Sequence, residues 1–505
     1  MLDYYLESDI IDQKILLAIL LTEKELTMAA ACSQTTLTAL KIKQYLRQFN
    51  ALFKGYLRIE LIKSRIYCEV LNDKREAFFY DIFALSDTLK MLTFLLLDNP
   101  KHKSIAVYTR KQGISQSKAY RLIHKLKHYL QDIGLNIVDN TVIGDELKIR
   151  YLIALLHKEY GIILYDIQPA DIETIHAFIF AAQKNLQPSA FLDRRFLFFD
   201  VLLMLTWKRH RYPVHLPHLA LFEHLKSLPI FDNIKTIAVD ELAPRTRVTF
   251  SSDDFDYLFL IYLTTDNSFL SGYWTSHQRQ QLYHLITKDP DYHLLIHRLQ
   301  ALVGKYSDIH EHIPNLIPFF KRTLYNLQTL ITFDGYYFDQ YQGNMLLLDK
   351  LETVIKDWLY DTGRQGSISS GHLHLMCLYL EQILESSIAP INITVIESQE
   401  TVGNVIANFI TSTIPSYKVE LSRVNILSDN IYPYDKPVDL VVTSQKLLPF
   451  LKELGVFPKE TRLFGLSLDC IQQQREDLIK TILALHQNWN CFSGSTPLVG
   501  SSSLF

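Results

Sequence analysis

Hydrophobic positions along the first 70 residues change from a helical spacing to a strand-like alternation. The helical spacing predicts a helix over Ile10–Leu21, a short piece over Thr27–Ala31 and a longer helix over Ser33–Phe49. Leu57–Val70 then alternates between apolar and polar side chains, which predicts two strands. Helix, short helix, longer helix and β-ribbon is the order of a winged helix-turn-helix.

The following residues repeat this order of elements. Gly113 is the expected left-handed end of a short helix, and Ser115 is a good N-cap for the long helix that follows to about Ile133. Asp139-Asn140 fits a hairpin turn between two strands. The predicted elements are helices over Arg75–Leu97, Ile105–Gln112 and 115–133, and strands over Leu135–Val138 and Val142–Ile149. The repetition predicts a tandem pair of winged units.

The long helix of the second unit has two chemically different faces. Ala119, Leu122 and Leu130 belong to an apolar stripe, whereas Lys118 and Arg121 begin a cationic face. Recognition helices present the side chains of their N-terminal end to base edges. The candidate DNA-contacting residues of this unit are Ser115, Gln116, Ser117, Lys118, Tyr120, Arg121 and Lys125. Alternatively, Ser115 only caps the helix and the cations are ordinary surface residues.

The long helix of the first unit provides a second set of candidates. Its N-terminal end is expected at Ser33, so the polar side chains that follow are expected to face DNA. These candidates are Ser33, Gln34, Thr35, Thr36 and Lys41. Here too, the residues can instead be an ordinary solvated helix end.

Charge separates the front of the chain from the remainder. Residues 1–160 contain 23 Lys and Arg against 18 Asp and Glu, a formal charge of +5, and the other residues contain 28 against 36, a formal charge of −8. No acidic residue lies between Glu25 and Glu60 or between Asp98 and Asp132, and the second window holds eight Lys and Arg. Solvated helix faces usually mix both signs. We therefore expect a polyanion to bind the front of the chain only.

Beyond residue 165 the apolar spacing is helical as far as about residue 388. This region is long enough for two helical bundles of similar size, divided near Asn267–Ser276. The predicted helices are Ile172–Leu186, Phe191–Lys208, Phe255–Leu263, Gln278–Leu285, Leu294–Val303, Leu316–Leu330, Asn344–Leu359 and His372–Leu384.

After residue 388 strands and helices alternate, which predicts a small parallel α/β domain. The predicted strands are Ile391–Ile396, Val419–Val424, Asp439–Ser444 and Thr461–Leu466, and the predicted helices are Val402–Ile414, Leu447–Leu454 and Ile471–His486. The Ser- and Gly-rich residues from Cys491 onward are expected to form a flexible end. The whole chain is thus expected to be multidomain and mainly α.

The composition narrows the class of protein. At 505 residues the chain is too long for one domain, and 48% hydrophobic with 12% aromatic residues suits packed domains. No apolar run reaches the roughly 20 residues of a membrane span, and the N-terminus lacks the basic start of a secretory signal. The five cysteines form no C-x-x-C pair. We therefore expect a cytoplasmic protein that binds no membrane, no metal and no cofactor.

The order of these elements resembles the Mga/AtxA family of Gram-positive global, often virulence-linked, regulators. The most specific stretches are Ser115-Gln116-Ser117-Lys118-Ala119-Tyr120-Arg121, Ile143-Gly144-Asp145-Glu146 and Ile149-Arg150, which closes the wing. The resemblance covers nearly the whole chain. It implies winged helix-turn-helix domains at 1–73 and 74–160, phosphotransferase-system (PTS) regulation domains at 166–272 and 273–388, an enzyme IIB-like domain at 389–490 and a flexible tail at 491–505.

The resemblance also implies that the protein senses the state of the PTS. In such regulators phosphorylated HPr, or a sugar-specific component, places a phosphoryl group on histidines of the regulation domains. A neutral imidazole nitrogen is a competent acceptor. His215 and His218 match the paired histidines of the first regulation domain, His284 is the best counterpart in the second, and His372 and His374 are further candidates. Any of these histidines can instead be an ordinary surface or hydrogen-bonded residue, because the chain contains 18.

The C-terminal domain departs from active enzyme IIB proteins, which carry a phosphorylated cysteine just after their first strand. Here the strand ending at Ile396 runs into Glu397-Ser398-Gln399-Glu400, and Cys470 and Cys491 lie elsewhere. We expect a catalytically inactive domain that is used for dimerisation or docking.

Taken together, these patterns predict a DNA-binding transcriptional regulator, an activator by resemblance, and not an enzyme. The expected partners are double-stranded promoter DNA, A·T-rich or curved, a phosphodonor such as HPr, RNA polymerase indirectly, and a second copy in a homodimer. One alternative is a DNA-binding regulator whose bundles sense a ligand or a protein without phosphorylation. Another is a PTS phosphotransfer protein, but the missing cysteine and the absence of a G-x-x-x-x-G-K-[ST] loop argue against it.

Overall fold

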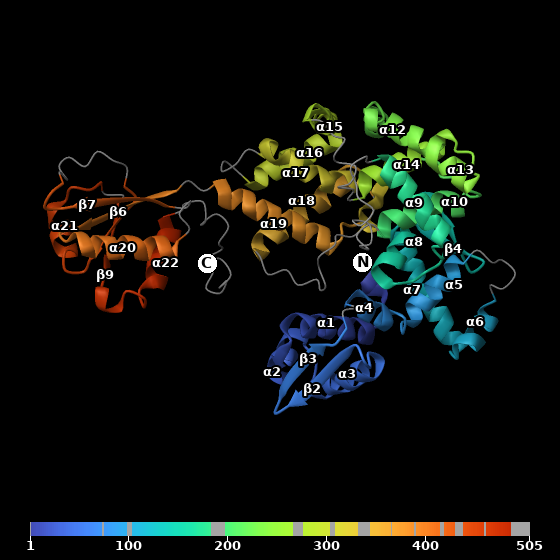
Figure 1. Ribbon diagram of the computed structural model, residues 1–505, viewed down its shortest axis with the longest axis horizontal. Helices are drawn as coiled ribbons and strands as arrows, with labels where there is room; N and C mark the ends of the chain where they lie inside the picture. The colour runs from blue at the N-terminus through green and yellow to red at the C-terminus, as the bar shows by residue number, and fades with distance from the viewer. Residues whose placement is uncertain are drawn as a thin grey trace. The chain divides into compact units, whose positions relative to one another are not determined.

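The computed structural model consists mostly of helices, with three small sheets in its described residues (Figure 1). The chain divides into two compact units. The first contains Met1–Leu299, His310–Tyr341 and Glu352–Met376, and the second contains Gln300–Ile309, Gln342–Leu351 and Cys377–Phe505. The structure describes residues 2–72, 75–97, 104–182, 197–265, 276–303, 309–331, 344–364, 366–387, 390–414, 419–429, 438–458 and 461–485.

The first winged unit has the predicted order of helices and strands. Its core is formed by apolar residues such as Leu16, Ile42 and Phe49, each fully buried. The sheet is antiparallel with the order β1-β3-β2, and β1 is an addition to the predicted elements. The elements are η1 (Leu2–Tyr5), α1 (Ser8–Glu23), β1 (Glu25–Thr27), α2 (Met28–Thr35), α3 (Ala39–Leu52), β2 (Leu57–Ile62) and β3 (Arg65–Val70).

The long helix of this unit begins later than predicted, so the expected start at Ser33 is wrong. Ser33 lies inside α2, which ends where Thr36 takes a left-handed conformation with a φ of 58°. The N-cap of α3 is Thr38, whose hydroxyl oxygen accepts a hydrogen bond from the amide of Lys41 at 3.3 Å. Ser33, Thr35, Thr36 and Thr38 are all residue types that can cap a helix, so residue type alone could not identify the cap.

The second winged unit also has the predicted order. The single helix expected over Arg75–Leu97 is wrong in one respect, because Ser86 caps a second helix by accepting a hydrogen bond from the amide of Leu89 at 3.2 Å. Gly113 ends α6 with a φ of 67° and Ser115 caps α7, both as predicted. The elements are α4 (Arg75–Phe83), α5 (Asp87–Leu96), α6 (Ile105–Gln112), α7 (Gln116–Asp132), β4 (Leu135–Val138), β5 (Thr141–Gly144) and α8 (Glu146–Tyr160).

The wing of the second unit is a hairpin that is shorter than predicted. Its turn is Asp139-Asn140, with φ values of 49° and 57° that suit a two-residue hairpin. The second strand ends at Gly144, so the predicted extension to Ile149 is wrong. Asp145 caps α8 directly afterwards, and Ile149-Arg150 therefore lies in a buried helix instead of closing the wing.

The first helical body continues from α8, which is buried over most of its length and packs against α10. Residues 183–196, which include the predicted helix ends Leu186 and Phe191, lie outside the described residues. The short helices between residues 220 and 246 were not predicted. The elements are α9 (Pro169–Ala182), α10 (Leu197–Lys208), α11 (Ala220–Leu225), α12 (Pro229–Ile237), η5 (Ala238–Leu242), α13 (Ala243–Thr246) and α14 (Ser252–Thr264).

The second helical body has helices close to the predicted positions, except that the single helix expected over Leu316–Leu330 is wrong. That helix ends at Lys321, and Tyr325 and Asn326 in the short 3-10 segment that follows have φ values of 52° and 58°. Trp358 and Tyr292 are fully buried in it, with ring centroids 5.8 Å apart. Residues 266–275, which hold most of the predicted division near Asn267–Ser276, lie outside the described residues. The elements are α15 (Ser276–Lys288), α16 (Pro290–Val303), α17 (Ile309–Lys321), η7 (Leu324–Thr329), α18 (Met345–Asp361) and α19 (Ser370–Ser387).

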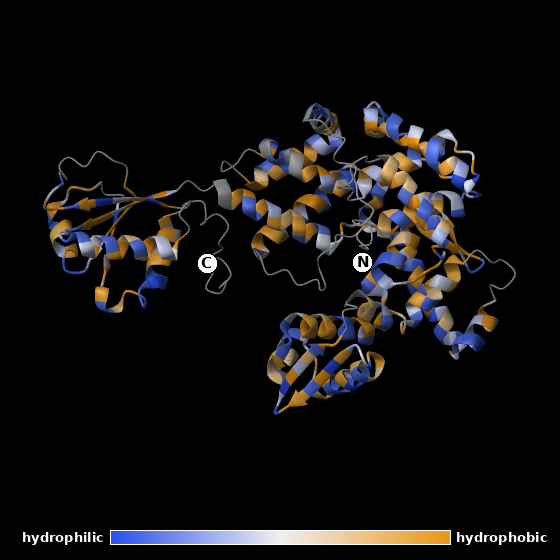
Figure 2. Cartoon of the chain, in the orientation of Figure 1, coloured by the Kyte–Doolittle hydropathy of each residue, from blue (hydrophilic) through white to orange (hydrophobic). Residues whose placement is uncertain are grey.

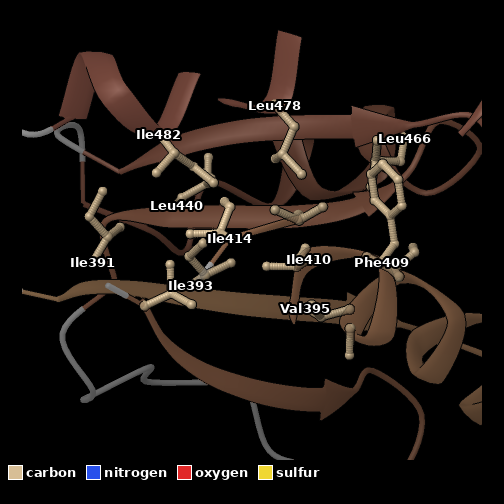
Figure 3. Packing of buried hydrophobic residues seen from close by; sticks show 14 residues of the cluster. Ile391, Ile393, Val395, Phe409, Ile410, Ile414, Leu440, Leu466, Leu478 and Ile482 are labelled. Atoms are coloured by element: carbon tan, nitrogen blue, oxygen red, sulfur yellow. The ribbon is translucent and has the colours of Figure 1, made fainter. Parts of the chain in front are cut away.

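The C-terminal domain is a three-layer α/β domain with four parallel strands in the order β7-β6-β8-β9. Ile393, Leu440 and Leu478 belong to the core between the sheet and helices α20 and α22 (Figure 3). Leu451 of α21 packs on the opposite face. The elements are β6 (Ile391–Glu397), α20 (Glu400–Thr413), β7 (Val419–Asn425), β8 (Leu440–Ser444), α21 (Leu448–Leu454), β9 (Arg462–Leu466), η9 (Leu468–Cys470) and α22 (Arg475–Leu485). The predicted flexible tail, 491–505, lies outside the described residues.

Hydropathy alternates along most of the helices, which carry both hydrophobic and hydrophilic residues (Figure 2). Amphipathic helices of this kind bury one face against a core and solvate the other. Among the described residues, no helix combines the length and the apolar character that crossing a membrane requires.

Candidate nucleic-acid interface and regulatory site

α7 is fixed in the second winged unit by its buried face. Ala119, Leu126 and Leu130 are fully buried, and the helix packs against α5, α6 and β4. At its first turn, the hydroxyl oxygen of Ser115 accepts a hydrogen bond from the amide of Lys118 at 3.2 Å. The cap and the packing hold the N-terminal end of α7 directly after the turn from α6, as in a recognition helix.

The opposite face of α7 is exposed and carries polar, aromatic and basic side chains. Tyr120 is 59% exposed, and the rings of His124 and His128 lie 4.7 Å apart. Arg121 and Lys127 are exposed and form no ion pair within the described residues. The exposed face consists of Gln116, Ser117, Tyr120, Arg121, His124, Lys127 and His128, hereafter the α7 face.

Two of the predicted DNA-contacting cations are engaged within the protein. Lys118 forms an ion pair with the carboxylate of Asp87 on α5. The ammonium group of Lys125 donates a hydrogen bond to the backbone carbonyl of Leu6 at 3.1 Å. Both side chains are half-buried, so they help to hold α7 in place, and their contact with DNA stays a prediction.

Sequence reasoning missed three members of the α7 face as site residues. His124, Lys127 and His128 all lie in the acid-free window of the second unit, so a signal for them existed. These three residues belong to the α7 face because a helix places residues three, four and seven positions apart on the same side. The same phase turns Lys118 and Lys125 toward α5 and the N-terminal residues.

Two exposed cations lie just before α7. Arg110 and Lys111 occupy the last turn of α6, where basic side chains also suit the negative end of the helix dipole. The turn at Gly113 joins this end of α6 to the N-terminal end of α7. The second unit therefore presents cations on both helices of its helix-turn-helix.

The first winged unit presents a smaller charge on α3. Its exposed face contains Leu40, which is 80% exposed, and the cations Lys43 and Arg47, with Gln44 and Gln48 between and beside them. These five residues are hereafter called the α3 face.

Lys41, predicted as a DNA contact, lies beside the α3 face but is engaged by acidic residues of α1. Its ammonium group lies 2.6 Å from the carboxylate of Asp12 and 3.1 Å from that of Asp9. Hydrogen bonds to Asp12, to Tyr45 and to Asp9 hold the pKa of Lys41 above its ordinary value. Its positive charge is thus largely neutralised inside the unit.

The other predicted contacts of the first unit lie at the end of α2, away from the start of α3. Thr35 is buried, and its hydroxyl donates to the carbonyl of Ala31 at 2.6 Å. The amide of the Gln34 side chain donates to Glu23 at 3.0 Å, and Ser33 and Thr36 are exposed. The structure therefore does not place these four residues at the N-terminal end of the recognition helix.

The two wings also differ in charge. The tip of the first wing is Lys63-Ser64, an exposed turn with φ values of 45° and 67°. The second wing, residues 135–144, contains no Lys or Arg, and its exposed side chains include Val138 and Ile143. Of the two wings, only the first offers a cation to a phosphate.

The two winged units are joined by the residues at the start of the chain. Glu7 completes the cap that Ser86 begins on α5: its carboxylate accepts hydrogen bonds from the hydroxyl of Ser86 at 2.6 Å and from the amide of Thr88 at 2.8 Å. The hydroxyl of Tyr160 donates to the carboxylate of Asp3 at 2.7 Å. These contacts fix the residues that precede α1 on the surface of the second unit.

Two consecutive helix-turn-helix units, each with a wing and with exposed cations on the recognition helix, define a tandem winged-helix protein of the DNA-binding class. Comparison with protein families identifies the same two regions. Residues 7–65 match the helix-turn-helix domain of the M protein trans-acting positive regulator (MGA), and residues 71–157 match the Mga helix-turn-helix domain. These two matches place the N-terminal region of the chain with the Mga family of regulators, as the sequence predicted, and they support a DNA-binding transcriptional regulator. A comparison with curated proteins found no match.

Two of the candidate phosphorylation sites lie in an irregular segment of the first helical body. Residues 209–219, hereafter the histidine loop, join α10 to α11 and include His215 and His218, both exposed. The Nδ1 atom of His215 lies 2.5 Å from a carboxylate oxygen of Asp253, in the first turn of α14. Val214 is buried beside it and anchors the loop.

The candidates in the second helical body differ in their access to solvent. His284 is exposed on α15. His372 and His374 are buried on α19, and burial, followed by the positive charge of Arg322, holds the pKa of His372 well below its ordinary value. A buried imidazole is out of reach of a protein phosphodonor.

The C-terminal domain has a carboxylate at the switch point of its strand order. β6 lies between β7 and β8, and α20 and α21 cover opposite faces of the sheet, so the carboxyl end of β6 is a switch point where such folds bind ligands. Glu397 is buried there, and its carboxylate accepts hydrogen bonds from the hydroxyl of Thr443 at 3.1 Å and from the amide of Ser444. A buried anion at this point repels a phosphoryl group.

Proposed function

We propose that this transcriptional regulator binds duplex DNA mainly through α7 and that phosphorylation of His215 by a PTS phosphodonor tunes its activity. The α7 face supports the first part. Arg121 and Lys127 can neutralise backbone phosphates, and Gln116, Ser117 and Tyr120 stand near the N-terminal end of the helix, from which base edges are reached. Promoter DNA that is A·T-rich or curved is the proposed target.

The contact between His215 and Asp253 is the observation that carries the second part. A carboxylate 2.5 Å from Nδ1 favours the tautomer with the proton on that nitrogen. The lone pair then resides on Nε2, and the side chain of His215 is 73% exposed, so a protein donor can reach it. Nε2 forms the new bond to phosphorus while the donor group leaves with the electrons of its own bond, and Asp253 stabilises the positive charge that develops on the ring.

The same contact distinguishes His215 from the other candidates. Within the described residues, no hydrogen bond orients the ring of His218 or of His284, although both side chains are exposed. We therefore assign the principal acceptor to His215, with His218 and His284 as secondary acceptors. Burial of His372 and His374 makes them the least suited.

The remaining domains fit this scheme as two PTS regulation domains, residues 166–272 and 273–388, and an enzyme IIB-like domain, residues 389–490. The parallel order β7-β6-β8-β9 supports the IIB-like assignment, and Glu397 at the switch point supports its loss of phosphotransfer. We propose that this domain dimerises the protein and that the dimer activates transcription through RNA polymerase indirectly.

Incubation with phosphoenolpyruvate, enzyme I and HPr, followed by intact-mass measurement and peptide mapping under conditions that preserve phosphohistidine, tests the acceptor. We expect one phosphoryl group on the His215 peptide, lost in His215→Ala and retained in the matched variant His218→Ala. Asp253→Asn should slow the labelling because the carboxylate no longer orients the ring.

A folded, DNA-binding protein that takes up no phosphate would remove the phosphorylation part of the proposal. Label on His218 or His284 alone would move the acceptor and show that the Asp253 contact has a structural role. The DNA-binding function stands in either case, because it rests on the winged units.

A further inference from the structure

A buried cluster of three charged side chains joins the second winged unit to the first helical body. Glu146 is the first residue of α8, and its carboxylate accepts hydrogen bonds from Nε and Nη2 of Arg209, both at 2.7 Å. The same carboxylate accepts a hydrogen bond from Nε of Arg150 at 3.0 Å. The side chains of Arg150, Arg209 and Glu146 are 0%, 4% and 10% exposed. Because removal of one partner would leave a buried charge unpaired, the cluster resists separation.

Arg150 also holds the backbone of the histidine loop. Its Nη2 atom donates hydrogen bonds to the carbonyl oxygens of Arg209 at 3.2 Å and Tyr212 at 2.9 Å. At the other side of the loop, His215 contacts Asp253 of α14. The loop is thus fixed between α8 of the winged unit and α14 of the helical body. Its anchor at Tyr212 lies three residues before the proposed phosphorylation site, His215.

The aromatic surroundings strengthen this attachment. The guanidinium of Arg150 lies 4.7 Å from the ring centroid of Tyr257, and that of Arg209 lies 4.5 Å from that of Tyr212. Burial opposes the charge of Arg209, but the hydrogen bonds and the negative charge of Glu146 outweigh burial and raise the pKa of Arg209. The guanidinium of Arg209 therefore stays charged, and the aromatic rings help to hold both guanidinium groups in place.

A continuous set of packed elements leads from this cluster to the DNA-binding face. α8 begins two residues after β5, which pairs with β4, and β4 packs against α7. A shift of the backbone at Tyr212 must be accommodated by Arg150, and then by Glu146 at the start of α8. Rigid elements with buried polar contacts transmit such shifts because they cannot deform continuously.

We propose that the Glu146–Arg150–Arg209 cluster couples the histidine loop to the second winged unit, so that a change of charge at His215 alters the affinity of the α7 face for DNA. This inference rests on the proposed function, since it takes His215 as the regulated residue. A negative charge at His215 is repelled by the carboxylate of Asp253, which contacts the Nδ1 side of the same ring, and this repulsion displaces the loop on which Arg150 holds Tyr212. The three residues of the cluster are positioning residues and do not touch DNA.

The test is a thermodynamic cycle on the full chain that needs no phosphodonor. The dissociation constant of promoter DNA is measured for the native protein, for His215→Asp, for Glu146→Leu with Arg150→Met and Arg209→Met, and for the combination. The triple replacement removes all three charges together, which leaves no buried ion unpaired. We expect His215→Asp to change the dissociation constant by about fivefold or more, as ordinary coupling between two sites does, and to have no effect in the triple variant.

His224→Asp is the matched control, because His224 is exposed on α11 outside the histidine loop; it should leave DNA affinity unchanged. If thermal unfolding shows that the triple variant does not fold, Arg150→Lys replaces it: lysine keeps the charge but cannot hold Glu146 and two carbonyls together, so the effect of His215→Asp should shrink. An equal effect of His215→Asp in both backgrounds, or none in the native background, would overturn the coupling. Absence of phosphate label on His215 is a separate result that concerns only the proposed function.

Discussion

The two winged units have the same order of elements but use their basic residues differently. In the first unit Lys41, Arg58 and Arg65 each lie in an ion pair with a carboxylate of the same unit. On α6 and α7 of the second unit, Lys118 is the one cation that is paired in this way among the described residues, with Asp87. Arg121 and Lys127 of the α7 face are exposed without an ion pair in the described part of the chain.

The difference indicates that the two units contribute unequally to DNA affinity, hereafter their division of labour. Neutralised cations release no counterions from DNA, so the first unit contributes little electrostatic affinity through those residues. The cations that it exposes on α3 and at the wing tip, and that lie in no ion pair within the described residues, are Lys43, Arg47 and Lys63. The wing of the second unit contains no Lys or Arg. This unit instead exposes cations on α6 and α7. We infer that the second unit provides most of the affinity and that the first supports it.

Of the changes that test this comparison, charge reversal on the α7 face should have the largest effect on DNA affinity. Arg121→Glu with Lys127→Glu is expected to weaken DNA binding by roughly 30-fold or more, at about 1 kcal/mol for each lost contact. The log–log salt slope should fall by roughly 2, because each phosphate contact contributes about 0.9. Fluorescence anisotropy with a labelled duplex measures both. Because the two side chains are exposed, the melting temperature of the protein should not change. Unaltered DNA binding would exclude α7 as the main DNA-contacting helix.

The matched reversal on the α3 face should have a smaller effect. Lys43→Glu with Arg47→Glu changes the formal charge by the same amount, yet we expect a loss of only about threefold. The same duplex and salt series are used for both double variants. If the α3 variant loses as much affinity as the α7 variant, the two units share the binding equally and the inferred division of labour is wrong.

The comparison also shows which parts of the fold could be predicted from the sequence. The position of α7 was predicted well because Gly113 and Ser115 each have one structural role that their residue type suits. The start of α3 was predicted wrongly because four neighbouring Ser and Thr residues can all cap a helix. The wing of the second unit was predicted too long because Ile149 continues the apolar alternation, while the cap at Asp145 decides the boundary.

The composition of the chain indicated the region of the candidate site, but it did not indicate which individual side chains are available there. The acid-free windows located both recognition helices, since composition does not depend on helical phase. The ion pairs of Lys41 with Asp12 and of Lys118 with Asp87 join residues 29 and 31 positions apart, so no local pattern reveals them. The Arg209–Glu146 contact spans 63 positions, and the resemblance had placed Arg150 at the edge of the wing. Tertiary contacts of this kind decide which cations remain available for DNA.

The junction between the units provides a third test. Glu7→Ala removes the carboxylate that caps α5, and we expect a loss of about 1 kcal/mol of unfolding free energy, the usual value of a helix cap. Calorimetry on the full chain measures the change. Glu7→Gln is the matched variant, because its amide oxygen can still accept one of the hydrogen bonds and should restore part of the stability. If both variants are as stable as the native protein, the residues before α1 do not secure the second unit.

Neutralising Lys118 should have the smallest effect, and it tests whether geometry or residue type determines a DNA contact. Lys118 and Arg121 lie three positions apart on α7, but the ammonium of Lys118 is paired with Asp87 whereas Arg121 faces solvent. We expect Lys118→Gln to weaken DNA binding by less than about twofold, because an ion already paired displaces few counterions. Arg121→Gln, measured on the same duplex, should weaken it by about fivefold or more. Equal losses would mean that Asp87 releases Lys118 when DNA binds, and the second unit would then contribute still more cations than the unbound structure indicates.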